Sequence, residues 1–171
     1  MTTERRLTRV LADEAEALGP KAAGHSDPPV VLLARARRAF AVAGLVSMVL
    51  AEHGVPARDA YDLGGILADA ACTVLDPVVG PELVAAHRAD LRRGEAQQLA
   101  QLAEFDITFN ARIGEPAIDD TMVTLLTGLS DLLAGVAADE RAIPEQRRAA
   151  RIADAQAREL WTHYGGDSGG W

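Results

Sequence analysis

The sequence predicts an all-α protein: a single-domain bundle of about six mostly antiparallel helices. Apolar residues recur at helical spacing along nearly the whole chain, and no stretch alternates convincingly as a strand. The connections are short, which favours antiparallel neighbours. With 171 residues, 49% of them hydrophobic but only 4% aromatic, the chain suits one core made mostly of Ala, Leu and Val. We expect residues 1–164 to form this domain and the Gly-rich residues 165–171 to form a flexible tail.

The first two helices differ in how they meet the core. The first is expected from Thr3 to Leu18, where Gly19 and Pro20 end it. The second runs from Val30 to His53 and is apolar almost all round after Arg38. A helix without a polar face belongs in the interior, so this one is expected to be central.

The third helix is expected from Ala57 to Leu75, with Asp76-Pro77 ending it. One of its faces is acidic, and the opposite face is apolar and predicted to point inward. The acidic face consists of Asp59, Asp62, Asp69 and Asp76, and the apolar face of Leu63, Leu67, Ala71 and Val74. We interpret the acidic face as solvated, with a basic partner or a divalent cation as the alternative.

The fourth helix is predicted from Pro81 to about Asn110, with proline at its first position. It carries two smooth faces, one with leucines and phenylalanines and one rich in alanine. A helix with two packing faces is either central in a monomer or part of a subunit interface. We therefore expect the second and fourth helices to form the centre of the bundle.

The last two helices are expected from near Asp119 to about Ala138 and from Pro144 to near Tyr164. The fifth has a strong apolar stripe opposite a stripe of small and polar residues. The apolar stripe is Met122, Leu125, Leu129, Leu132 and Val136, and the small stripe is Thr121, Thr124, Gly128, Asp131 and Gly135. The small stripe allows either close helix packing or the approach of a ligand to the backbone.

Charge and hydropathy exclude several classes of function. A net charge of −8 argues against nucleic-acid binding and against attachment to an anionic membrane surface. The N-terminus lacks an apolar signal core, and the longest charge-free run inside a helix, Ala39 to Ala51, is too short to span a bilayer. We expect a cytoplasmic protein.

Neither a metal nor a cofactor is expected. Cys72 is the only cysteine, which excludes an internal disulfide and a cysteine-based zinc site. Di-iron bundles use Glu-x-x-His pairs, whereas Glu82 and His87 are five residues apart and Glu159 and His163 are four apart.

Polar groups interrupt the most apolar stripe of the fourth helix, which gives the main functional clue. At 100° per residue this stripe contains Val84, His87, Leu91, Glu95, Gln98, Leu102, Phe105 and Phe109. Burying an imidazole, a carboxylate and an amide is costly unless each finds a partner. His87 and Glu95 are the candidate catalytic residues for proton transfer.

Candidate ligand-binding residues surround this pair. Gln98 lies in the same stripe, and Arg37 on the second helix could hold an anion. Phe105, Asp106 and Phe109 could form a pocket wall or, alternatively, a core plug at the helix end. The structural alternative for Arg37 is a buried ion pair with Glu95.

Two functional hypotheses follow. The first is a small-metabolite protein that binds or transforms a polar or anionic molecule in a polar pocket inside the bundle. The second is a non-catalytic accessory or dimerisation subunit that packs on a partner protein, such as a second copy, through Ala-rich helix faces. The polar positions within the fourth helix favour the first.

Overall fold

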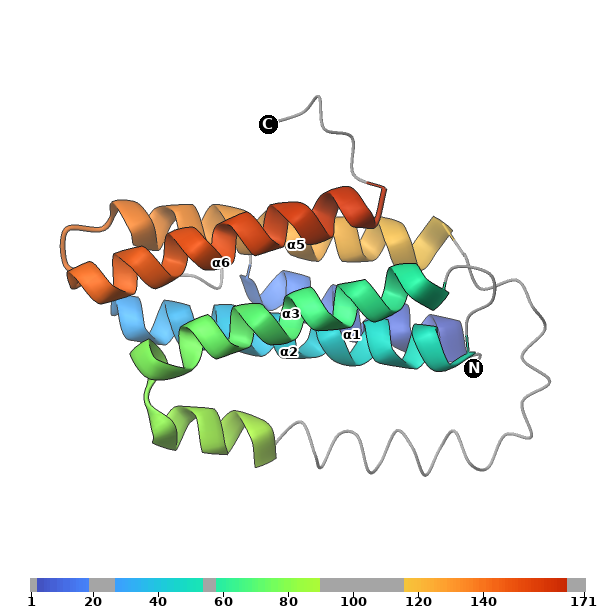
Figure 1. Ribbon diagram of the computed structural model, residues 1–171, viewed down its shortest axis with the longest axis horizontal. Coiled ribbons are helices and arrows are strands. Elements are labelled where there is room, and N and C mark those ends of the chain that lie inside the picture. The colour runs from blue at the N-terminus through green and yellow to red at the C-terminus, as the bar shows by residue number, and fades with distance from the viewer. Residues whose placement is uncertain (1–2, 19–26, 54–57, 90–115, 166–171) are drawn as a thin grey trace.

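The computed structural model describes residues 3–18, 27–53, 58–89 and 116–165. These residues form an all-α bundle, as the sequence predicts (Figure 1). The labelled helices are α1 (Thr3–Leu18), α2 (Pro29–His53), α3 (Arg58–Val79), α5 (Pro116–Ala138) and α6 (Pro144–His163). A further helical segment covers residues 81–89. The remainder of the expected fourth helix and the tail after residue 165 lie outside the described residues.

Successive helices run in opposite directions along the long axis of the molecule (Figure 1). Helices α5 and α6 lie side by side above α2 and α3 in this view, and α1 lies behind. Helix α2 contacts α1, α3, α5 and α6, which makes it the central helix. This position explains why it lacks a polar face: solvent reaches it only along narrow strips.

The expectation that the fourth helix is also central does not hold for residues 81–89. In this segment only Val84 is buried, while Leu83, Ala85 and Ala89 are exposed. Helix α5 takes the second central position: of its predicted apolar stripe, Leu132 is half-buried and the other four residues, Met122, Leu125, Leu129 and Val136, are fully buried.

Helix α3 continues past Pro77, contrary to the expected end at Asp76-Pro77. Pro77 lies in the last turn of α3, so its missing N–H removes one backbone hydrogen bond and leaves the preceding turns of the helix intact. The extra turn buries Val79 in the core. Gly80 then ends the helix with a φ of 96°, and its N–H donates to the Asp76 carbonyl at 3.2 Å.

The buried face of α3 also differs from the one expected. Leu63 is 42% exposed, and Leu67 and Val74 are only half-buried. The residues of α3 that reach the core are Tyr61, Ala68, Ala71, Cys72, Leu75 and Val79. The helix is therefore rotated so that smaller side chains face α2, which lets the two backbones approach closely.

This close approach is visible at two glycines. A Cβ on Gly44 would lie 3.2 Å from the Ala68 Cβ, and a Cβ on Gly64 would lie 3.1 Å from the Ser47 Oγ. Ser47 donates to the Ala43 carbonyl at 2.8 Å, so its oxygen accepts the hydrogen bond from the Tyr164 hydroxyl at 2.6 Å. The end of α6 is thus connected to the α2–α3 contact.

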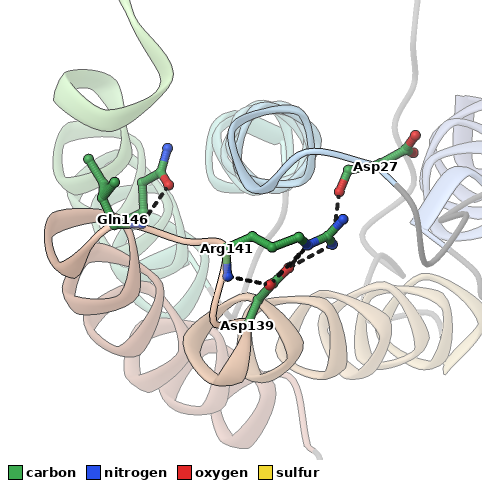
Figure 2. Close-up of polar contacts among 5 residues, drawn as sticks. Asp27, Asp139, Arg141 and Gln146 are labelled. Atoms are coloured by element: carbon green, nitrogen blue, oxygen red, sulfur yellow. Dashed lines mark hydrogen bonds and ion pairs between the residues drawn. The ribbon is translucent and has the colours of Figure 1, made fainter.

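The turn between α5 and α6 is held by the Arg141 side chain (Figure 2). Its guanidinium pairs with the Asp139 carboxylate at 2.7 Å and donates to the Asp27 carbonyl just before α2. At the start of α6 the Gln146 side chain accepts the Ile143 N–H at 3.2 Å. These contacts join the α5–α6 hairpin to the start of the central helix.

One helix among the described residues, Ile118–Ala138, is long and apolar enough to cross a membrane by length and composition. Its buried side chains pack against α1, α2 and α6 within the bundle.

The tight contact at Gly64 yields a stability prediction. Gly64→Ala should lower the free energy of unfolding by about 1–2 kcal/mol, because the added methyl group would press on the Ser47–Tyr164 hydrogen bond. Gly135→Ala is the matched control, since a Cβ there meets nothing within 4 Å. It should raise stability by about 0.5–1 kcal/mol through helix propensity. Urea denaturation followed by circular dichroism measures both, and equal effects would contradict the packing argument.

Candidate functional site

A groove of about 330 Å³ lies between α2 and α3. Most of its wall is apolar or small. This part consists of Phe40, Ala41, Gly44, Leu45 and Met48 from α2 and Gly65, Ala68 and Cys72 from α3. The groove exists because small residues on both helices leave space that larger side chains would fill.

The other part of the groove is lined by the charged residues Arg37, Asp69, Asp76 and Arg88 and by the polar Thr73. Arg37 Nε donates to Asp76 Oδ1 at 2.5 Å, and Arg88 Nη2 donates to Asp76 Oδ2 at 3.1 Å. One carboxylate therefore joins α2, α3 and the helical segment 81–89. Both of its oxygens are engaged, and the three groups together carry one net positive charge.

Arg37 is the most unusual member of this cluster because it is only 3% exposed. Its Nε is paired with Asp76, but its Nη1 is buried without a hydrogen-bond partner. A buried guanidinium donor without an acceptor is costly, and such groups are rare in folded proteins. An acceptor atom supplied by a ligand would remove this cost.

Cys72 lines the same groove and is buried. Its thiol donates to the Arg37 carbonyl at 3.5 Å. Burial raises the pKa of the Cys72 thiol from 9.0 to about 11, and the neighbouring Arg37 charge offsets only part of this effect. The thiol is therefore protonated at neutral pH and is a weak nucleophile.

No family model, no curated protein and no solved structure matches this chain.

The structure places two of the sequence-predicted site residues. Arg37 lines the groove, whereas His87 is half-buried on the segment 81–89 and is not part of the groove wall. The other predicted site residues lie outside the described residues: Glu95, Gln98, Phe105, Asp106 and Phe109.

Arg37 has a different partner from the one considered in the sequence. The buried ion pair forms with Asp76, and Glu95 lies outside the described residues. Asp76 is consequently not part of a solvated acidic face, since its side chain is 28% exposed and holds two arginines. Sequence reasoning missed both Asp76 and Arg88 as site residues, and the one available signal was that an arginine on a buried helix needs some carboxylate.

Within the described parts of the chain, no group of three or more His, Cys, Asp or Glu side chains is placed to hold a metal ion.

The shared carboxylate predicts an asymmetry between two mutations. Asp76→Ala should lower the free energy of unfolding by about 3 kcal/mol, because it leaves the buried Arg37 charge without its partner. Arg88→Ala should lower it by less than about 1 kcal/mol, since Arg88 is 59% exposed. Urea denaturation measures the free energy of unfolding of both variants. Similar losses in the two variants would show that the burial of Arg37 does not dominate the contribution of this cluster to stability.

The raised pKa of Cys72 predicts an alkaline loss of stability. The unfolded chain releases the Cys72 thiol proton at lower pH than the folded protein does. The stabilisation of the folded state by the protonated thiol is therefore complete below about pH 9 and is lost as the pH rises towards 11. The slope should approach about 1.4 kcal/mol per pH unit. Cys72→Ala should lack this component, whereas tyrosine ionisation affects both proteins equally. Denaturant titrations between these pH values provide the measurement, and parallel curves would contradict the assignment.

Proposed function

We propose that this protein binds a small molecule carrying an anionic group in the groove between α2 and α3. The observation that carries the proposal is the buried Nη1 of Arg37, which has no acceptor. An anionic oxygen is the acceptor that best matches a guanidinium, because the hydrogen bond is then charge-assisted.

The surrounding charges support an anion as the ligand. Asp76 neutralises one positive charge, but Arg37 and Arg88 provide two. An anion at Arg37 would therefore balance the charge of the Arg37–Asp76–Arg88 cluster, while Asp69 elsewhere in the groove wall favours a ligand with a single negative charge. Arg88 also lowers the cost of placing this anion near Asp76, because both Asp76 oxygens already face arginines.

The proposed activity is binding, located in the cytoplasm. The groove arginines pair with Asp76, and the Cys72 thiol is protonated at neutral pH and is a weak nucleophile. Binding of the anion does not require proton transfer by His87 or Glu95.

The test compares two adjacent arginines. Arg37→Met should weaken the binding of the probe hexanoate about 10-fold or more, since one charge-assisted hydrogen bond contributes about 1.5–3 kcal/mol. Arg38→Met is the matched control, because Arg38 pairs with Glu14 on α1 and lies outside the groove. NMR titration of the ¹⁵N-labelled protein reports both the affinity and the location of binding.

Each variant needs a folding control in this experiment. Arg37→Met removes one partner of a buried ion pair, but Asp76 keeps Arg88 as a partner, so the loss of stability should be smaller than for Asp76→Ala. Circular dichroism and urea denaturation establish that both variants are folded. Binding that is equally weakened by Arg38→Met would contradict the role given to Arg37.

A second candidate function is packing on a second copy of this chain. It is favoured by large apolar side chains exposed on α2 and α3: Met48 is 58%, Leu63 42% and Ile66 64% exposed. Light scattering after size-exclusion chromatography tests it. A dimer that Ile66→Glu converts to monomer would support this function, and a monomeric wild-type protein would exclude it.

A further inference from the structure

The ligand class can be narrowed by asking what the rest of the groove accommodates. We infer that the ligand is a linear aliphatic monocarboxylate, with its carboxylate at Arg37 and its alkyl chain between α2 and α3. This inference rests on the proposed function, because it assumes that an anion binds at Arg37.

The shape of the groove favours an extended ligand. Arg37 and Met48 both line it and lie eleven positions apart on α2, which corresponds to about 16 Å along the helix. The wall between them includes Gly44, which packs closely against Ala68, and Gly65, where a Cβ would be at ordinary contact distance from the Met48 side chain. A groove that is long relative to its volume of about 330 Å³ fits an extended chain better than a ring system.

Charge is unevenly distributed along the groove. The arginines lie at one end, Leu45, Met48 and Gly65 are uncharged, and the further charge among the described lining residues is the Asp69 carboxylate. A second carboxylate on the ligand would therefore face apolar groups or the like charge of Asp69, without a cation as its partner. This separation favours one charged end and one apolar end on the ligand.

Met48 lies at the apolar end of the groove and is 58% exposed. An alkyl chain that reaches this residue would remove its side chain from water. Methionine is flexible and adapts to chains of different length. Affinity should therefore increase with the number of methylene groups until the chain passes Met48.

The experiment is a calorimetric titration with hexanoate, octanoate and decanoate below their micellar concentrations. Each buried methylene group contributes enough to lower Kd about fourfold, so each step of the series should lower Kd about 15-fold. Octanedioate should bind more weakly than octanoate. A Kd that is independent of chain length, or tighter binding of the dicarboxylate, would overturn the inference.

A matched pair of variants locates the alkyl chain. Gly65→Leu should fill the groove and abolish the dependence on chain length, since a Cβ at this position has room, with the Met48 Cγ 3.6 Å away. Gly135→Leu makes the same change within α5, where a Cβ meets nothing within 4 Å, and should leave the series unchanged. If Gly65→Leu is not folded, Met48→Glu replaces it, because a charge at this exposed position should weaken decanoate more than hexanoate. A chain-length dependence that survives the folded variant would overturn the inference.

The outcomes separate this inference from the proposed function. If acetate, succinate and inorganic phosphate bind in an Arg37-dependent way but the alkyl series shows no increment, the anion site stands and the alkyl groove is wrong. If neither these anions nor any member of the series binds, both proposals are wrong. Binding of the series that is unaffected by Arg37→Met would also contradict both.

Discussion

Burial of the Arg37 guanidinium in the central helix constrains much of the surrounding structure. Helix α2 contacts four other helices, so a charge on its inner surface cannot reach water and needs a carboxylate. That carboxylate is Asp76, in the last turns of α3. Gly80 then turns the chain so that residues 81–89 run back beside α3 and place Arg88 on the second Asp76 oxygen. Three elements are thereby joined through a single carboxylate.

The scarcity of aromatic residues has two opposite consequences for α2 and α3. Small residues let these helices approach so closely that a Cβ on Gly64 would press on the Ser47–Tyr164 hydrogen bond. The same interface also contains the groove, whose wall includes Gly44 and Gly65. Close packing and the groove thus arise from one compositional feature, and large side chains in this interface would remove both.

The sequence predicted those features that depend on local periodicity. The bounds of α1, the central position of α2 and the buried stripe of α5 follow directly from the spacing of apolar residues. The end of α3 was wrong because the burial of Val79 outweighs the hydrogen bond that Pro77 removes. The buried face of α3 was wrong because close approach to α2 favours Ala68 over the larger Leu63. Such choices depend on the neighbouring helix, which periodicity does not reveal.

The candidate site shows the same division between local and non-local information. An arginine within an apolar helix could be selected from the sequence as a candidate site residue, but its partner lies 39 positions away on another helix. Many carboxylates were available, and only the packing of α2 against α3 selects Asp76. That selection leaves one guanidinium donor of Arg37 unsatisfied, because the carboxylate binds Nε on one side and Arg88 on the other. The ion pair that allows Arg37 to be buried therefore does not supply an acceptor for Nη1. The proposed anionic ligand would supply this acceptor.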